Sequence, residues 1–308
     1  MDLTATDAIN TLESSGASPN IQPTETQNQA HQLALPEAPL VVIQPSRSWV
    51  KLGLHDLWVY RELLLFLIWR DVKVRYKQTV LGATWVIMQP LLMTIVFTVF
   101  LGKLARVPSG NIPYPLLVYS GLLPWTFFSS ALTSSSNSLV GSSNLITKVY
   151  FPRMIIPIAA VGARLVDFAI AFAILAGLML YYGVGLSRQI VMLPIFLILI
   201  TALSLGVGMW ASAVNVKYRD VGVAIPVLVQ LWMFASPVVY PLDLVPENWR
   251  TLYALNPMAG IIGGFRASLL GGKLHWTAFA VSTGATIVIL IYAAYAFRRM
   301  EKFFADLV

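Results

Sequence analysis

The sequence predicts an all-α polytopic membrane protein. Of its 308 residues, 57% are hydrophobic and only 11% are charged, which is about half the charge content of a typical soluble domain. The mean hydropathy is +0.72. The charges are clustered, and the windows between them are long enough to cross a hydrocarbon core about 30 Å thick at about 1.5 Å per helical residue. We predict six transmembrane helices, an N-terminal amphipathic interface helix and a short outer re-entrant helix pair.

Six windows have the length that a membrane span needs. The first lies between Lys77 and Lys103, where no residue is charged. The third contains two charges and is apolar elsewhere. The predicted spans are residues 80–102, 113–139, 155–187, 189–216, 221–242 and 274–297.

The first 46 residues differ in composition from the rest of the chain. They contain five acidic residues, no Lys or Arg, and many Ser, Thr, Gln, Asn and Pro residues. Such a segment buries too little apolar surface to offset the entropy cost of ordering it. It also lacks the positive and apolar regions of a signal peptide. We expect a disordered acidic cytoplasmic tail at 1–46 and a membrane domain at 47–308.

The distribution of Lys and Arg predicts the orientation, because short loops rich in these residues stay in the cytoplasm. With the N-terminus inside, the cytoplasmic side holds most of them. Both termini are therefore expected to be cytoplasmic. Subtracting the tail's charge of −5 from the net charge of +7 leaves +12 on the membrane part. This charge suits anionic lipid headgroups, and nucleic acid is a poor alternative partner.

Several kinds of chemistry are excluded on this chain. The absence of Cys rules out disulfides, thiolate metal sites and cysteine nucleophiles. The three His residues, His31, His55 and His275, lack ligand spacing, so we expect no metal site. No Gly-x-x-x-x-Gly-Lys-Ser/Thr loop occurs, so a partner must bind the nucleotide if ATP powers transport. We expect no cofactor and no enzymatic activity on this chain.

A helix at the cytoplasmic interface is predicted over residues 55–78. Its apolar core, residues 63–69, is flanked by charges and is too short to cross a membrane. The alternative is that the basic residues of this segment only keep it on the cytoplasmic side of the membrane. The polar residues expected to meet headgroups or a partner are Arg70, Asp71, Lys73, Arg75, Tyr76 and Lys77.

The outer segment 243–273 joins the fifth and sixth spans. Its apolar pieces are too short to span, and Pro257 and two Gly-Gly pairs divide it into short helices. Two interpretations remain open at this point. The helices either dip into the outer leaflet and return, or they form an ordinary folded loop.

Six strings along the chain indicate a known family. They are RYKQTVLGATWVIMQP (75–90), SGLLPWTFFSSAL (120–132), NLITKVYFPRMIIP (144–157), NVKYRDVGVAIP (215–226), SPVVYP (236–241) and LYALNPMAGIIGGFR (252–266). From about Asp56 to the C-terminus, the chain resembles the transmembrane subunits of type-2 ABC transporters that export polysaccharides, such as O-antigen, capsule and teichoic acid. The resemblance implies a homodimer with two ATP-binding cassette subunits, which carry ATP and Mg²⁺. It also implies a continuous channel for an undecaprenyl-linked polysaccharide.

The resemblance further implies contacts with the ATPase. The family has its coupling helix in the loop at 141–153, and the turn at 217–220 is a second candidate. The alternative is that the basic residues of these two segments only set the orientation of the chain in the membrane. The candidates are Asn144, Lys148, Tyr150, Phe151, Arg153, Tyr218, Arg219 and Asp220.

Arg164 and Asp167 form a candidate charge pair inside the third span. Their spacing of three residues places them on one face of a helix, which reduces the cost of charge in lipid. The pair is either structural, or it meets a diphosphate headgroup or gates the cavity mouth.

Aromatic residues are candidates for the channel wall, because the flat C–H faces of sugars suit aromatic rings. The alternative is the aromatic belt at the membrane interface. The candidates are Trp85, Trp125, Phe127, Phe128, Trp232, Phe234 and Tyr240.

The expected function is export of a lipid-linked polysaccharide, O-antigen above all, by an ATP-driven transporter of which this chain is the permease. One alternative is a type-2 ABC exporter of small drugs or lipids with the same topology. The other is an ion-coupled carrier, against which the scarcity of intramembrane carboxylates argues.

Overall fold

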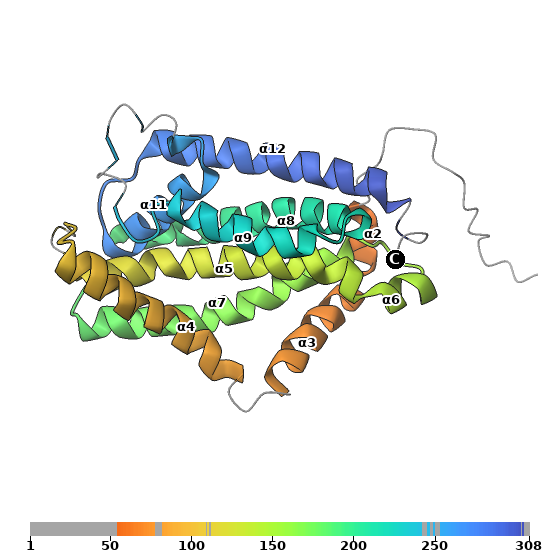
Figure 1. Ribbon diagram of the computed structural model, residues 1–308, viewed down its shortest axis with the longest axis horizontal. Helices are drawn as coiled ribbons and strands as arrows, with labels where there is room; N and C mark the ends of the chain where they lie inside the picture. Colours follow the sequence, from red (N-terminus) through yellow and green to blue (C-terminus); the bar gives the residue numbers. More distant parts are fainter. Residues whose placement is uncertain are drawn as a thin grey trace, which may run out of the picture. The chain divides into compact units, whose positions relative to one another are not determined.

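The computed structural model describes residues 54–77, 82–108, 110, 112–241, 245–246, 249, 253–302 and 304. The predicted acidic tail, 1–46, lies outside these residues. The described part of the chain consists of helices and their connections and contains no strand (Figure 1). The predicted all-α class is confirmed there.

Five helices in the described part are long and apolar enough to cross a membrane. The first span, Thr84–Leu104, combines α4 (Gly82–Phe97) with the π-helical η1 (Thr98–Leu104). The fourth, Arg188–Lys217, joins η2 (Arg188–Met192) to α8 (Leu193–Lys217). The second, third and last are α5 (Tyr114–Gly141), α7 (Ile155–Tyr181) and α12 (Trp276–Glu301). These five helices coincide with predicted spans one to four and six.

The predicted fifth span is only partly helical. Helix α9 (Val221–Phe234) has 14 residues, which corresponds to a length of about 21 Å. A non-helical segment follows at 235–241. Pro237 lies in this segment, and proline has no N–H with which to continue a helix. The helix is therefore shorter than predicted, and six full-length spans are not confirmed.

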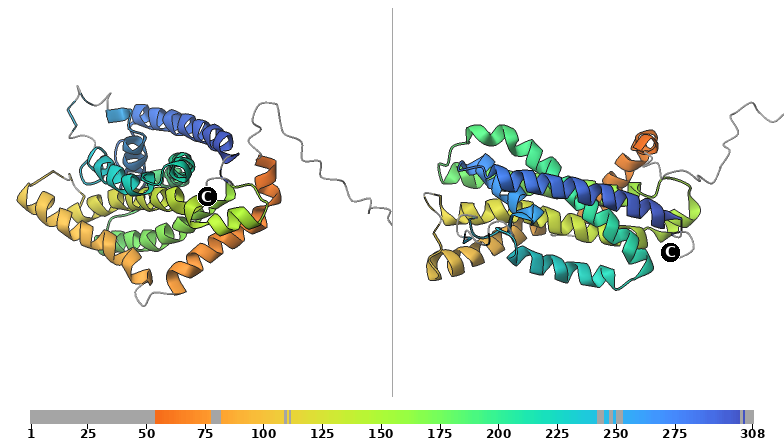
Figure 2. Two further views of the ribbon diagram at one scale, coloured as in Figure 1. Left: turned by 45° about the vertical axis from the view of Figure 1, so that its right-hand side comes forward. Right: turned by 90° about the horizontal axis from the view of Figure 1, so that it is seen from above.

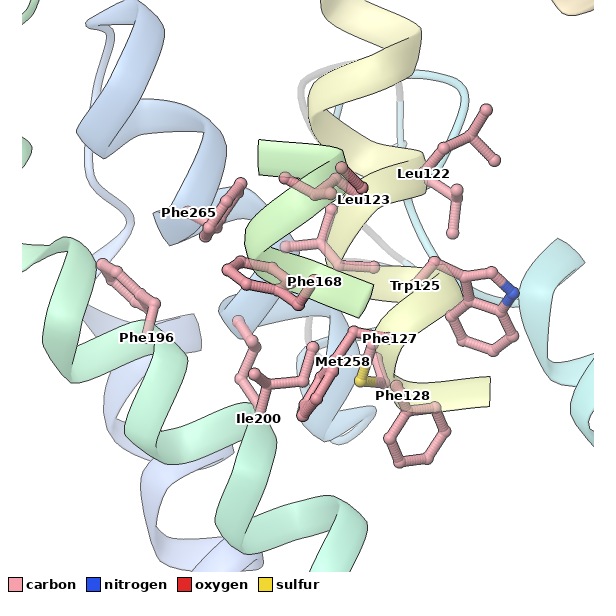
Figure 3. Close-up of a cluster of buried hydrophobic side chains, with 14 of the residues drawn as sticks. Leu122, Leu123, Trp125, Phe127, Phe128, Phe168, Phe196, Ile200, Met258 and Phe265 are labelled. Atoms are coloured by element: carbon pink, nitrogen blue, oxygen red, sulfur yellow. The ribbon is translucent and has the colours of Figure 1, made fainter. Parts of the chain in front are cut away.

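Helix α5 is the central element of the bundle. It packs against α4, α7, α8, α9 and α11 (Pro257–Leu270), and 78% of its apolar window is buried. Tyr119 on α5 donates a hydrogen bond to the Ala171 carbonyl of α7 at 3.0 Å. Aromatic side chains of α5, α7, α8 and α11 gather in the core (Figure 3). In contrast, only 11% of the first span is buried, so most of its surface is free for lipid or a partner.

The segment predicted to form the interface helix folds into two helices, α2 (Leu54–Val59) and α3 (Arg61–Lys77). Tyr60 links them through backbone hydrogen bonds with Asp56 and Leu64. Helix α3 packs on α7, where a Cβ atom at Gly162 would lie 2.8 Å from Ile68 Cδ1. Helices α3 and α4 diverge from neighbouring ends (Figures 1 and 2).

A second apolar cluster joins α3, α8, α12 and the short helix α6 (Ser143–Lys148) at one end of the bundle. The rings of Phe297 and Phe304 lie 5.3 Å apart within it. Phe151, which follows α6, is buried in the same cluster. The cluster therefore fixes the segment after α6 to the bundle.

Asn256 connects the end of α9 to the start of α11. Its Oδ1 accepts hydrogen bonds from Trp232 Nε1 and the Met258 backbone N–H, both at 3.0 Å. Its Nδ2 donates to the Ala235 carbonyl at 2.8 Å and to Ser236 Oγ at 2.9 Å. One side chain thus caps α11 and satisfies a carbonyl released at the end of α9.

Replacing Asn256 with Ala is expected to lower the thermal unfolding midpoint of the detergent-purified protein by several degrees, because both helix ends lose their partner. Asn256→Asp keeps the acceptor oxygen but loses the amide donor, so its unfolding midpoint should lie between those of the parent and of Asn256→Ala. Size-exclusion thermal shift measures the order. An Ala variant as stable as the parent would contradict the assigned role.

Candidate functional site

A cavity of about 520 Å³ lies between α4, α5, α7 and α9. Part of its wall is apolar and includes Trp125, Phe127 and Phe168. Its polar lining residues are Gln89, Thr126, Ser129, Ser130, Thr133, Arg164, Asp167 and Gln230. Polar groups are costly in hydrocarbon unless they have partners. Their concentration at one cavity indicates water or a polar ligand there.

Arg164 and Asp167 meet, as their spacing predicts, with Arg164 Nη1 3.1 Å from Asp167 Oδ2. Two residues of α3 reach the same carboxylate. Arg75 Nη1 lies 2.5 Å from Oδ2, and the Tyr76 hydroxyl donates to Oδ1 at 2.5 Å. The Arg164 guanidinium also donates to Ser134 Oγ on α5, from Nε at 2.9 Å and from Nη2. The cluster therefore links α3, α5 and α7.

Tyr76 is a hydrogen-bond donor in this cluster. Partial burial, and secondarily the hydrogen bond to Asp167, raises its pKa to about 12. It therefore stays protonated at physiological pH. Nothing in the sequence connects residues 75 and 76 with residue 167, about ninety positions away. The interface prediction placed both side chains against headgroups or a partner, whereas the structure places them on Asp167.

The aromatic candidates divide between cavity, core and exterior. Trp125 and Phe127 line the cavity. Phe128 does not, because its ring is fully buried between Trp125 and Trp232, with ring centroids 5.7 and 5.1 Å away (Figure 3). Phe128 therefore packs in the core of this structure, and its channel-lining role stays a prediction.

The remaining aromatic candidates do not line this cavity. Trp85 and Phe234 are more than half exposed and are accessible to lipid or another chain. Trp232 is half-buried and donates to Asn256. The Tyr240 hydroxyl lies 2.7 Å from the Tyr253 hydroxyl.

The candidates for ATPase coupling are partly exposed. Asn144, Lys148 and Tyr150 lie on the surface around α6, as do Tyr218, Arg219 and Asp220 after α8. Phe151 is buried, which corrects the expectation that it projects towards a partner. Its apolar ring is more stable in the second cluster than in water.

Arg153 is held by the end of α12. Its backbone N–H donates to Glu301 Oε1 at 3.1 Å, and its Nη1 donates to the Glu301 carbonyl at 2.6 Å. Arg298 Nη1 donates to Glu301 Oε2 at 3.0 Å. Glu301 therefore fastens the segment after α6 to α12, a contact that sequence spacing could not indicate.

Glu301→Ala is expected to loosen that segment, because the Arg153 amide loses its acceptor and Arg298 loses a charge partner. Hydrogen exchange of the amides of residues 149–151 and 153 should accelerate by several-fold in the detergent-purified protein. Lys302→Ala, which alters an exposed neighbour, is the control. Unchanged exchange in Glu301→Ala would show that the apolar cluster alone holds the segment.

Asn215 organises the second exposed turn. Its Oδ1 accepts from the Gly222 backbone N–H at 2.9 Å, while its Nδ2 donates to the Ser136 carbonyl at 2.9 Å and to Asn137 Oδ1 at 3.1 Å. A Cβ atom at Gly222 would lie 2.6 Å from Asn137 Oδ1. The start of α9 is thereby fixed against α5.

Arg266 is buried inside the bundle on α11. Its Nη2 donates to the carbonyls of Val238 and Leu117 at 2.9 and 3.2 Å, and its Nη1 donates to the Tyr240 carbonyl at 3.2 Å. The sequence analysis assigns no role to this residue. A single Arg within an apolar helix was the available signal for a buried structural cation.

Comparison with known proteins identifies the family. Residues 62–270 match the ABC-2 type transporter family. The chain belongs to this family. It is therefore the membrane subunit of an ABC transporter and a multi-pass inner-membrane protein.

Curated members of the ABC-2 family are similar over most of their length. The O-antigen export system permease protein RfbA of Myxococcus xanthus is 30% identical over 243 residues, 78% of this chain and 92% of the relative. An RfbA protein of Klebsiella pneumoniae is 27% identical over 254 residues, 82% of this chain and 97% of the relative. The polysialic acid transport protein KpsM of Escherichia coli is 25% identical over 213 residues, 67% of this chain and 80% of the relative.

Proposed function

We propose that this chain is the permease subunit of an ATP-driven exporter that moves lipid-linked polysaccharide, most specifically O-antigen, across the inner membrane. The observation that carries the proposal is the similarity to RfbA permeases over more than nine-tenths of their length. The cavity fits such a cargo, because it combines aromatic rings with hydroxyl and amide groups. Aromatic rings suit sugar C–H faces, and the polar groups suit sugar hydroxyls.

The working assembly is a homodimer with two ATP-binding subunits that carry ATP and Mg²⁺. The chain has no P-loop motif of its own. The largely unburied first span offers surface to a second copy. Asn144, Lys148, Tyr150 and the turn at 218–220 offer exposed polar and aromatic groups to the ATPases. The cargo is an undecaprenyl-linked glycan.

In the proposed topology both termini are cytoplasmic, α9 and the segment to Tyr240 form the fifth crossing, and α11 is re-entrant from the outer side. Helix α6, the ends of α8 and α12, and Phe304 share one apolar cluster, which agrees with a common cytoplasmic end. Because α11 is enclosed by α5, α8 and α12, its embedded backbone has the protein surroundings that re-entry needs. Membrane-impermeant thiol labelling of single Cys residues at 144 and 273 tests the sidedness.

Depletion of the chain tests the proposed function. Undecaprenyl-linked glycan should accumulate on the cytoplasmic side, and surface polysaccharide should disappear, while re-expression restores both. Unchanged surface polysaccharide with lost drug resistance would favour the drug exporter. Transport by the purified chain without an ATPase would favour the ion-coupled carrier.

Trp85→Ala is expected to reduce polysaccharide export by several-fold without reducing the amount of assembled transporter. The reason is that Trp85 presents an exposed ring on the first span, where a passing sugar could stack. Tyr292→Ala removes a similarly exposed ring from α12 and is the matched control. Surface polysaccharide per assembled complex is the measurement, and normal export by Trp85→Ala would remove this residue from the path.

A further inference from the structure

We propose that Glu301, the last residue of α12, is a positioning residue for energy coupling. It fastens the segment after α6 to α12, so that a movement imposed on α6 by an ATP-binding subunit passes to α12 and from there to α11. This route differs from the sequence connections of α6, which lead to α5 and α7. The inference rests on the proposed function for the contact between α6 and the ATP-binding subunit.

Three contacts meet at Glu301. Its carboxylate accepts hydrogen bonds from the Arg153 backbone N–H, on Oε1 at 3.1 Å, and from Arg298 Nη1, on Oε2 at 3.0 Å. Its main-chain carbonyl accepts from Arg153 Nη1 at 2.6 Å. The last carbonyls of a helix have no partner within the helix, and a cation at this end is favourable. Arg153 is therefore joined to both the side chain and the main chain at the end of α12.

The attachment is shielded from water. The side chains of Arg298 and Glu301 are only 15% and 17% exposed, so their ion pair is screened less than a surface pair is. Ile146 and Phe151, each 5% exposed, anchor the same segment in the second apolar cluster. Apolar packing has no preferred direction, whereas the hydrogen bonds of Glu301 fix the segment to one helix.

Helix α6 and the residues after it have an exposed and a buried side. Asn144, Lys148 and Tyr150 are exposed, so a partner subunit can contact them. Ile146 and Phe151 pack in the cluster that contains residues of α8 and α12. A force applied to the exposed side therefore acts on a segment whose buried side is attached to α12.

Helix α12 extends this attachment along the bundle. It has 26 residues, which corresponds to a length of about 39 Å. Its C-terminal end lies at the same end of the bundle as α6, and α11 packs beside its N-terminal half (Figure 1). A Cβ atom at Gly260 of α11 would lie 2.3 Å from Ser282 Oγ and 2.4 Å from the Ala278 carbonyl oxygen. Because the two helices are in such close contact, a displacement of one is transmitted to the other.

Helix α11 connects the route to the segment after α9. Arg266 on α11 donates to the carbonyls of Val238 and Tyr240, which belong to the non-helical segment that follows α9. Gln230 and Met233 of α9 line the cavity. A movement that begins at α6 thus reaches the cavity wall through α12 and α11.

Fluorescence at the far end of α12 tests the route. The chain has no Cys, so a bimane on Thr277→Cys, at an exposed position in the first turn of α12, is a unique probe in a complex with a Cys-free ATP-binding subunit. ATP added to this complex in nanodiscs should change the bimane fluorescence, and Glu301→Ala should reduce the change at least threefold while ATP hydrolysis is retained. An undiminished change, a parallel loss of hydrolysis, or no change in the parent would each overturn the proposal.

Matched variants separate the route from general stability. Glu301→Gln keeps an oxygen that can accept from the Arg153 amide, so it should retain most of the response; a response as low as that of Glu301→Ala would overturn the assigned hydrogen bond. Lys302→Ala, at an exposed neighbour, should respond as the parent does. A bimane on Leu180→Cys, at an exposed position on α7, should respond equally in the parent and in Glu301→Ala. Loss of the response at both positions would indicate general loosening and overturn the proposal.

Two further outcomes keep the test decisive. If Glu301→Ala does not assemble, Glu301→Asp retains the charge on a side chain that is one methylene shorter and should lower the response about twofold; a parental response would overturn the proposal. The fluorescence measurement needs no glycan. A response that depends on Glu301, with unchanged surface polysaccharide after depletion of the chain, would reject the proposed function alone. Lost polysaccharide after depletion, with a response independent of Glu301, would reject the route alone.

Discussion

Replacing Arg266 with Met is expected to abolish assembly of a folded transporter. The side chain is only 8% exposed, and it donates to the carbonyls of Leu117, Val238 and Tyr240. Methionine has a similar length but no donor, and the bilayer core has no water to take its place. Each unpaired buried group costs about 1–3 kcal/mol. Three together are comparable with a total stability of about 5–15 kcal/mol.

The yield of monodisperse protein after detergent extraction measures this effect. Arg266→Lys keeps the charge but has one nitrogen for three carbonyls, so its yield and unfolding midpoint should be intermediate. An Arg266→Met protein that purifies with the parental midpoint would show that the segment after α9 is held by other contacts, such as those of Asn256.

Gly121→Ala should have the same effect for a steric reason. A Cβ atom at this position would overlap the Val238 carbonyl oxygen and the Arg266 guanidinium. The backbone of α5 and the segment after α9 approach so closely that only glycine fits between them. Gly177→Ala, where a Cβ atom meets nothing within 4 Å, is the matched control and should be neutral or slightly stabilising.

Asp167→Asn is expected to detach α3 from α7. The substitution preserves shape but removes the charge that holds Arg75 and Arg164 together. Removing one partner of a buried ion pair typically costs about 3–5 kcal/mol, and here two guanidinium groups would also repel each other. The expected result is a lower unfolding midpoint and a loosened interface helix.

The chain has no Cys, so one introduced thiol is a unique probe of this change. Ile68→Cys places it where α3 packs on Gly162, and Asp167→Asn should increase its maleimide labelling rate by several-fold. Asp71→Asn is the control, because Asp71 pairs with its neighbour Arg70 at a partly exposed site. Labelling that is insensitive to Asp167→Asn would mean that apolar contacts alone hold α3.

The effect of Arg266→Met could not be predicted from the sequence, and the effect of Asp167→Asn could be predicted only in part. The contact between Arg164 and Asp167 follows from helical spacing, which is local. The contacts of Arg75 and Tyr76 with Asp167 depend on how α3 folds back along α7. Likewise, Phe127 and Phe128 are adjacent, chemically identical and both buried, at 3% and 0% exposed, yet only Phe127 also lines the cavity. The difference is the direction in which each side chain leaves α5.

The membrane class, the positions of five apolar spans and the helix that precedes them could all be predicted from the sequence. These features depend on the length of uncharged apolar runs, which is a local property matched to the thickness of the bilayer. The end of α9, the burial of Phe151 and Arg266, and the contacts of α3 with the Asp167 carboxylate on α7 emerge only in the folded chain. Such features depend on hydrogen bonds and packing between segments far apart in the chain, and no local pattern encodes those partners.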